Sequence, residues 1–328
     1  MSEQDATTLS FSKKLRYGGE SALFFPFMAA FWLIGIDAAS ALGGFIGRHL
    51  FYRLGPARRA KLNLRAAYPD MSENEIDAIV REMCDNLGRV VAEYPHLGKL
   101  TLGGPGARIQ IDGIENADAA FAKGKGVMFI SGHFANWETM PVAAGLLGYE
   151  GGLVYRPPNN PTVDRWISRQ RAKLGPKEQI SKGARGTRRI FTLLRKGKSI
   201  LMLVDQKTNE GVPAPFFGRD AMTTPAPAAL ALKLGSVLLP ASVERLKGAH
   251  FRMHVHPAIE FSPSGDEERD VLELTAKINR AIEDMVRTRP SQWLWIHRRW
   301  PGPRDQKQMA QTLGGTGVRV ARDGSSLT

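Results

Sequence analysis

The chain has 328 residues, of which 43% are hydrophobic and 23% are charged. This balance is ordinary for a folded protein with a sizeable core and excludes an intrinsically disordered chain. The formal net charge of +13 favours anionic partners, such as nucleic acid, an acidic membrane surface, a phosphorylated substrate or an acidic protein. A single cysteine, Cys84, excludes an intramolecular disulfide and a multi-cysteine metal site.

The N-terminal part of the chain is strongly apolar. Residues 22–36, "ALFFPFMAAFWLIGI", carry no charge, and the apolar character continues past Asp37 to Gly47. A membrane-spanning helix needs about 20 apolar residues, and this run reaches that length only by including Asp37. Basic residues on both sides fit a helix in the membrane interface as well as a spanning one. We expect residues 1–50 to form a membrane anchor rather than a signal peptide, with a buried core helix as the alternative.

A helical segment is expected over residues 51–104. Ser72 and Glu75 form a capping-box pattern, and apolar residues then recur at helical spacing from Ile76 to Tyr94. The glycine-rich stretch "TLGGPGA" follows and predicts a boundary with the main domain, residues 105–305. Residues 306–328 lack apolar periodicity and predict a flexible tail.

The main domain alternates between two kinds of segment. Short β-rich runs occupy residues 108–111, 127–131, 152–156, 199–204, 236–244 and 250–261. Segments of helical length lie between or after them, at residues 136–147, 161–174, 185–196, 225–234 and 266–289. Such alternation predicts an α/β fold with a mainly parallel central sheet flanked by helices.

One of these runs, "VMFISGHFANWE" at residues 127–138, places His133 just beyond a buried strand. Ligands of open parallel sheets collect at the carboxyl ends of strands. If a helix begins near Ala135, its N-terminus favours a neutral imidazole, and Glu138 lies close enough to accept the other ring N–H. Such a pair would activate an incoming hydroxyl without an enzyme nucleophile. The spacing alone also occurs by chance, and the alternative is a histidine that caps a helix beside a surface glutamate.

Other chemistries fit the sequence less well. Ser131 lacks the glycine required for a serine-hydrolase elbow, and Thr192 stands where a P-loop needs its first glycine. Three histidines share a face of the strand that begins near residue 250, but Arg252 projects between them. We expect a solvated strand face there and no metal site.

Basic residues form a second signal, because arginine side chains bind phosphate and carboxylate groups in a fork. Those near His133 could hold a phosphorylated substrate or stabilise an oxyanion. Nucleic-acid binding is not expected, since no aromatic side chains that could stack on bases are interleaved with these charges.

Several ordered motifs carry a family resemblance. They are "LNLRAAYPDMSENE", "SGHFANWE", "VYRPPNNPTVDRWISRQR", "VDQKTNEGVPAPFFGRDAMTT" and "SQWLWIHRRW". With the apolar N-terminus, they make the chain resemble the bacterial lipid A biosynthesis acyltransferases, the lauroyl and myristoyl transferases of the lysophospholipid-acyltransferase superfamily. The resemblance extends to about Arg304. One departure is Ser291, where the family often has glutamate.

The resemblance implies transfer of a fatty acyl chain from acyl carrier protein to a hydroxyl of a phosphorylated, acylated glucosamine lipid A precursor. It implies membrane lipids as partners, the cytoplasmic face of the bacterial inner membrane as the location, and no cofactor. Acylation of another glycolipid or of a lysophospholipid is the near alternative. A basic membrane-associated binding protein without activity is the alternative from another class.

The resemblance also assigns roles to single residues. His133 would be the general base and Glu138 its orienting acid. Arg171 and Asp205 match functional positions that contact substrate. Three arginines are weaker matches, as phosphate or structural contacts: Arg156, Arg298 and Arg299.

Overall fold

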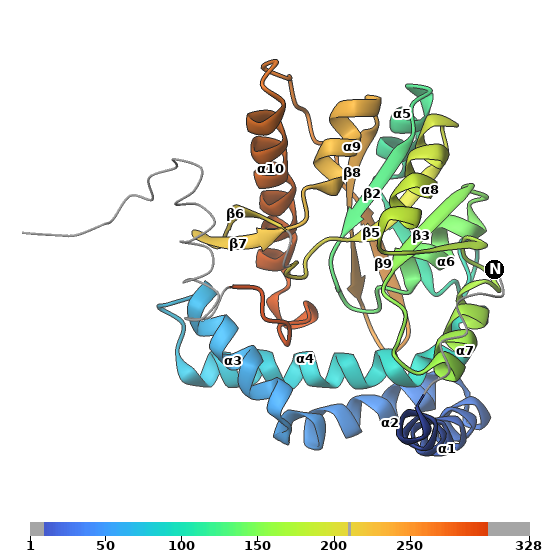
Figure 1. Cartoon of the computed structure of the whole chain (residues 1–328). Coiled ribbons are helices and arrows are strands. Elements are labelled where there is room, and N and C mark those ends of the chain that lie inside the picture. Colours follow the sequence, from blue (N-terminus) through green and yellow to red (C-terminus); the bar gives the residue numbers. More distant parts are fainter. Residues whose placement is uncertain (1–9, 209–210, 301–328) are drawn as a thin grey trace, which may run out of the picture.

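A seven-stranded sheet forms the centre of the computed structural model, which describes residues 10–208 and 211–300 (Figure 1). The strand order is β1-β9-β8-β2-β5-β3-β4, and every neighbouring pair is parallel except β8 and β9. The expected mainly parallel α/β fold is therefore confirmed. The strands are β1 (Ile109–Asp112), β2 (Val127–Ser131), β3 (Gly151–Tyr155), β4 (Glu178–Ser181), β5 (Ser199–Leu203), β8 (Val237–Arg245) and β9 (Phe251–Val255).

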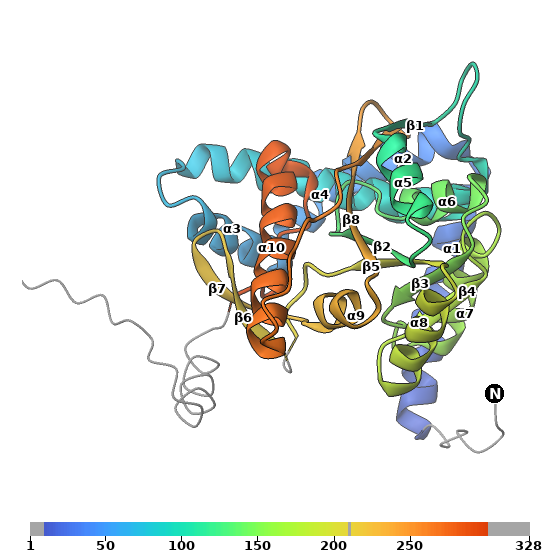
Figure 2. The same ribbon diagram turned by 90° about the horizontal axis from the view of Figure 1, so that it is seen from above.

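Helices cover both faces of this sheet, as the view from above shows (Figure 2). Side chains of a strand alternate between faces, so Met128 and Ile130 of β2 join one hydrophobic cluster while Val127 and Phe129 join the other. The first cluster contains residues of α8 (Ala184–Arg195), α9 (Ala226–Leu234) and α10 (Glu267–Thr288). The second contains residues of α5 (Ile114–Ala122) and α6 (Thr139–Leu146).

The apolar N-terminal run forms two helices rather than one. Helix α1 (Phe11–Leu33) ends just before Gly35, whose φ of 78° is left-handed, and α2 (Gly35–His49) starts there. Asp37, the charge within the run, lies 2.7 Å from the Arg108 guanidinium, at the start of the sheet domain. No helix in the described ranges is both long enough and apolar enough to cross a bilayer.

The remaining front segment contains η2 (Phe51–Arg53), α3 (Gly55–Ala67), α4 (Glu73–Glu93) and η3 (Tyr94–Lys99). The predicted capping box at the start of α4 is confirmed, with Ser72 and Glu75 bonded to each other's backbone N–H groups. Helix α4 runs below the carboxyl ends of the central strands in Figure 1. It therefore brings residues of the front segment to the sheet.

Helices α2 and α4 pack through small residues. A Cβ atom added at Gly47 would lie 2.0 Å from the Cys84 carbonyl oxygen, and one added at Gly88 would lie 2.0 Å from that of Gly43. Only glycine allows the two backbones to approach so closely. This contact fixes α2, and with it the apolar N-terminus, against the body of the protein.

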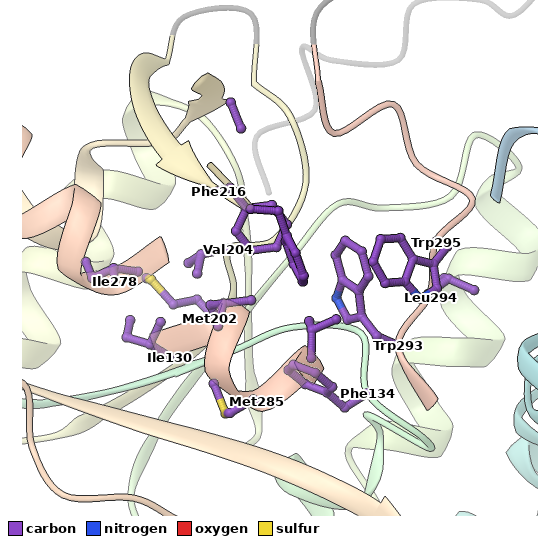
Figure 3. Packing of buried hydrophobic residues seen from close by; sticks show 14 of the residues in the cluster. Ile130, Phe134, Met202, Val204, Phe216, Ile278, Met285, Trp293, Leu294 and Trp295 are labelled. Atoms are coloured by element: carbon purple, nitrogen blue, oxygen red, sulfur yellow. The ribbon is translucent and has the colours of Figure 1, made fainter. Parts of the chain in front are cut away.

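A hairpin of β6 (Val212–Phe216) and β7 (Arg219–Thr223) packs against α10. The chain continues through α9, β8, β9 and α10 to η4 (Pro290–Gln292). Figure 3 shows Phe216 and Val204 in the same buried cluster as Trp293 and Trp295. This aromatic cluster packs the last described segment against the end of β5.

Helix α7 (Pro161–Arg171) follows β3 and contacts η3 and α1. The tail predicted at residues 306–328 lies outside the described residues.

Candidate active site

The Asp205 carboxylate meets the His133 imidazole at the end of two adjacent strands. Strands β2 and β5 are parallel, and their pairing matches Ser131 with Leu203. His133 and Asp205 each follow two residues later, so the register brings them side by side. His133 Nδ1 lies 2.8 Å from Asp205 Oδ1, and the His133 backbone N–H donates to Asp205 Oδ2 at 2.8 Å.

Asp205 is almost fully buried and accepts a further hydrogen bond, from Trp293 Nε1–H at 2.8 Å. Burial alone would raise the pKa of Asp205, but the positive charge of a protonated His133 and the hydrogen bonds from His133 hold that pKa well below its usual range. The carboxylate is therefore ionised at neutral pH. An ionised carboxylate accepts only, so the proton shared with His133 belongs to Nδ1, and the lone pair of the neutral ring lies on Nε2.

Glu138 has different partners from those that the sequence suggested. Its carboxylate forms a two-pronged ion pair with Arg171, with Nη2 to Oε1 at 2.6 Å and Nε to Oε2 at 2.8 Å. It also accepts hydrogen bonds from the Tyr94 hydroxyl and from Trp137 Nε1–H. The His133 ring thus contacts Asp205, and the Glu138 carboxylate contacts Arg171, Tyr94 and Trp137 in place of the predicted His133 ring.

The ion pair of Glu138 and Arg171 is deeply buried. Burial would raise the pKa of Glu138, but the Arg171 charge and the hydrogen bonds to the carboxylate keep that pKa below its usual value. Burial raises the pKa of the Tyr94 hydroxyl well above 10, and the adjacent Glu138 carboxylate adds to the effect. Glu138 reaches His133 only indirectly: the Trp137 ring that donates to Glu138 packs edge-on against the imidazole, with centroids 5.1 Å apart.

The segment between β2 and α6 is a loop, and this explains the difference. Helix α6 begins at Thr139 and not near Ala135. Ala135 has a φ of 43°, which is incompatible with a right-handed helix, and its N–H donates to the Gln292 carbonyl. His133 therefore lies outside the first turn of the helix, and the expected influence of the helix N-terminus on its charge does not apply.

Buried polar side chains of α4 and β8 hold the loop between β2 and α6 in place. The Asn136 side chain donates to Glu93 Oε2 at 2.8 Å, and the Asn86 side chain donates to the Ala135 carbonyl at 3.0 Å. Arg245 joins the two supports, because it pairs with Glu93 and donates to Asn86 Oδ1. Helix α4 and strand β8 thus fix the loop that carries His133.

Two residues near His133 were not predicted as site residues. The Gln206 amide nitrogen lies 3.3 Å from His133 Nε2 and 3.1 Å from His297 Nε2. Burial lowers the pKa of His297 to about 4, and the neighbouring His133 contributes to the decrease. Gln206 directly follows Asp205, and His297 lies in the motif "SQWLWIHRRW", so both stood beside residues that the sequence did single out.

The three weaker arginine predictions differ in burial. Arg156 follows β3 and is exposed, and Arg298 is also exposed. Arg299 is buried under the hairpin, where it donates to the Met222 carbonyl, Thr223 Oγ1 and Asn279 Oδ1. Burial lowers the pKa of Arg299 to about 10. Its two Nη groups donate to protein oxygens, which is the arrangement of a structural contact.

The histidine-bearing strand has local partners. His254 lies 3.4 Å from Glu244, and His256 lies 3.1 Å from the Ser242 hydroxyl. Within residues 10–208 and 211–300, no three side chains of histidine, cysteine, aspartate or glutamate are grouped to hold a metal ion.

The arrangement has a definite chemical capability. A neutral imidazole with its lone pair on Nε2, oriented by a buried carboxylate, can take a proton from a hydroxyl group. The His133 side chain is 15% exposed, so part of the ring reaches the surface of the protein.

Comparisons with known proteins give the same class of chemistry. The family model described as bacterial lipid A biosynthesis acyltransferase matches residues 9–301. The chain is 26% identical to the lipid A biosynthesis palmitoleoyltransferase of Escherichia coli (strain K12) over 249 residues, which covers 74% of this chain and 77% of that protein.

Two further relatives extend the comparison. The lipid A biosynthesis lauroyltransferase of the same strain is 27% identical over 257 residues, covering 74% of this chain and 79% of the relative. The phosphatidylinositol mannoside acyltransferase of Mycobacterium tuberculosis (strain H37Rv) is 25% identical over 213 residues, covering 61% and 63%. The chain therefore belongs to the bacterial lipid A biosynthesis acyltransferase family and is an O-acyltransferase.

Proposed function

We propose that this enzyme transfers a fatty acyl chain from the thioester of acyl carrier protein to a hydroxyl of a phosphorylated, glucosamine-based lipid A precursor. The observation that carries the proposal is the pairing of His133 with Asp205 within a chain of this family. In this reaction His133 Nε2 removes the hydroxyl proton as the oxygen attacks the thioester carbonyl. The C–S bond then breaks, and the departing sulfur takes the proton from the imidazolium.

Asp205 is the orienting acid in this mechanism. It fixes the ring by two contacts, one to Nδ1 and one to the backbone N–H, and its negative charge stabilises the imidazolium that forms during proton transfer. Glu138 and Arg171 act differently. Their ion pair joins the loop that carries His133 to the end of α7. Trp137, which donates to Glu138, packs against the imidazole and so helps to position it.

Positive charge suits both proposed substrates. A phosphorylated lipid and an acidic carrier protein are attracted to a chain with a net charge of +13. Exposed Arg156 and Arg298 are the arginines of the predicted set that remain available for such contacts.

The front helices offer a surface for membrane lipids. Large apolar side chains are exposed along α1, α2 and α3, including Leu23 at 79% and Phe45 at 60%. Such a patch on a soluble surface marks an interaction site. Exposed cations on α1, η2 and α3 suit the headgroups of an anionic membrane: Lys13, Lys14, Arg53 and Arg58. We place the enzyme at the cytoplasmic face of the inner membrane, with this surface in the membrane interface.

The function is tested by product analysis. The full-length protein in detergent micelles is incubated with acyl carrier protein thioesters and a lipid A precursor. The molecular mass of the lipid product is then measured by mass spectrometry. The expected product is heavier by one acyl chain. Absence of that product with every chain length of donor would contradict the proposal.

A second acceptor follows from one comparison. The mycobacterial relative is named for a mannosylated phosphatidylinositol, so another glycolipid is the alternative acceptor. Parallel assays with that glycolipid and with a lysophospholipid identify the acceptor by the ratio of initial rates.

Membrane binding is tested separately with vesicles. Leu23→Asp and Phe45→Asp place charges within the exposed apolar surface, and we expect each to weaken sedimentation with phosphatidylglycerol vesicles by at least about tenfold. Leu272→Asp, at a 42% exposed position on α10, is the matched control. Equal vesicle binding by all three variants would refute the proposal that this apolar surface binds the membrane.

A further inference from the structure

Gln206 lies between two imidazole rings. Its amide nitrogen faces His133 Nε2 at 3.3 Å on one side and His297 Nε2 at 3.1 Å on the other, and the two ring centroids are 5.4 Å apart. An amide NH₂ group has two N–H donors, so one amide can serve both rings. The atom that Gln206 faces on His133 is the one that removes the substrate proton in the proposed reaction.

The protons in this group follow from its neighbours. His133 carries its proton on Nδ1 because that atom faces the ionised Asp205 carboxylate, which leaves the Nε2 lone pair as an acceptor. His297 is neutral at pH 7, since its pKa is lowered to about 4 by burial first and by His133 second. Gln206 therefore donates one N–H to His297 Nε2 and one to the lone pair of His133 Nε2.

His297 is itself held in place. The Asn63 side chain of α3 donates to the carbonyls of both His297 and Trp295, each at 2.6 Å. The His297 backbone is thus fixed relative to α3, and the His297 ring offers Nε2 to the Gln206 amide. Gln206 can release His133 and keep the bond to His297.

An imidazole nitrogen has one in-plane lone pair and accepts one strong hydrogen bond. The amide N–H and a substrate hydroxyl consequently exclude each other at His133 Nε2. Resting on the proposed function, we propose that Gln206, anchored by His297, occupies the hydroxyl position on His133 and keeps water from that nitrogen until the acceptor lipid replaces the amide.

The proposal concerns a competing reaction of the same site. A water molecule at Nε2 could lose its proton to His133 and attack the thioester carbonyl, the C–S bond would break, and the products would be free fatty acid and the protonated thiol. Transfer differs only in that the attacking oxygen belongs to the acceptor lipid. Gln206 and His297 are positioning residues that set the ratio of hydrolysis to transfer.

The experiment measures that ratio. Full-length wild type, Gln206→Met and His297→Ala are given an acyl carrier protein thioester with and without lipid A precursor, and free fatty acid and acylated lipid are quantified. Methionine keeps the length of glutamine but has no donor. In both variants we expect the ratio of hydrolysis to transfer to rise by about fivefold, the equivalent of one hydrogen bond of ~1 kcal/mol.

Three further variants distinguish an effect of the contact between Gln206 and His133 from a nonspecific effect of substitution. Gln110→Ala removes an exposed glutamine that contacts Arg252 and should leave the ratio unchanged. His297→Gln retains an acceptor oxygen and should restore the ratio partly. Addition of His133→Ala to Gln206→Met should abolish the extra hydrolysis, because the base is gone.

An unchanged ratio in folded Gln206→Met and His297→Ala would overturn the inference, as would extra hydrolysis that survives loss of His133. Thermal unfolding identifies a variant that has lost its fold. If one of the two variants is unfolded, the ratio of hydrolysis to transfer in the other variant tests the inference. A wild type that acylates no acceptor would refute the proposed function itself. Transfer by the wild type with an unchanged ratio in the variants would refute this inference alone.

Discussion

Asp205 is the carboxylate that contacts His133, with Oδ1 2.8 Å from Nδ1. The two residues are 72 positions apart in sequence and are neighbours only because β2 and β5 lie side by side. The proposed mechanism gives the two acids of the site distinct roles: Asp205 orients the imidazole, and Glu138 forms part of an ion pair with Arg171.

Replacement of Asp205 should therefore impair chemistry directly. Asp205→Asn keeps the shape of the side chain but removes the charge that stabilises the imidazolium and fixes the proton on Nδ1. We expect the kcat for acyl transfer to fall by about two to four orders of magnitude. Steady-state kinetics with a saturating lipid acceptor measures the change. A variant with near wild-type kcat would show that Asp205 does not orient the base.

The buried ion pair should be costly to break from one side. In Arg171→Met the Glu138 carboxylate keeps only the donors of Tyr94 and Trp137, and we expect a loss of about 3–5 kcal/mol in the free energy of unfolding. Urea denaturation measures the loss, and the double variant Glu138→Gln/Arg171→Met should regain part of it. Arg269→Met, which breaks an exposed pair with Glu273, is the control and should leave the free energy of unfolding close to that of the wild type. Equal effects of Arg171→Met and Arg269→Met would contradict the structural role of the pair.

Acid should destabilise the protein through the same two carboxylates. The pKa values of Asp205 and Glu138 are both depressed in the fold, in each case because opposing charge and hydrogen bonds outweigh burial. The unfolded chain then takes up protons before the folded chain does, so the free energy of unfolding is highest above about pH 5 and falls as the pH decreases below it. Urea denaturation at pH 7 and pH 4 checks the sign, and Asp205→Asn should show a smaller decrease than the wild type. An equal or larger decrease in that variant would show that Asp205 does not contribute to the loss of stability in acid.

The close contact of α2 and α4 gives a prediction about stability rather than chemistry. Gly47→Leu directs a side chain at the Cys84 carbonyl, and we expect a loss of about 1–3 kcal/mol or more in the free energy of unfolding. Gly18→Ala is the matched control, because no atom lies within 4 Å of a Cβ at that helical position and alanine favours the helix. Thermal unfolding should separate the two. If Gly47→Leu were as stable as Gly18→Ala, the helices would not pack as described.

Much of the fold could be predicted from the sequence. The alternation of apolar runs with helical segments predicted a mainly parallel sheet, and Ser72 with Glu75 predicted the start of α4. These features are local, since they depend on side-chain periodicity and on groups within one helical turn. The split of the apolar N-terminus at Gly35 was missed because hydropathy alone does not report a left-handed residue.

The site was predictable only in part, for a related reason. His133 could be found because it follows a buried strand, whereas Asp205 was found only through the family resemblance. Their contact depends on strand order, which the sequence does not show, and Glu138 was therefore the nearer candidate. The conformation of Ala135 also mattered, because it delays the helix and leaves Glu138 facing Arg171.

The central claim is that His133 is the base that activates the acceptor hydroxyl. It is tested most directly by the initial rate of ester formation on the lipid A precursor, measured for wild type and His133→Ala with matched thermal unfolding and vesicle binding. We expect the variant to lose at least about three orders of magnitude in rate while it remains folded and membrane-bound. Ester formation by His133→Ala at the wild-type rate would contradict the mechanism.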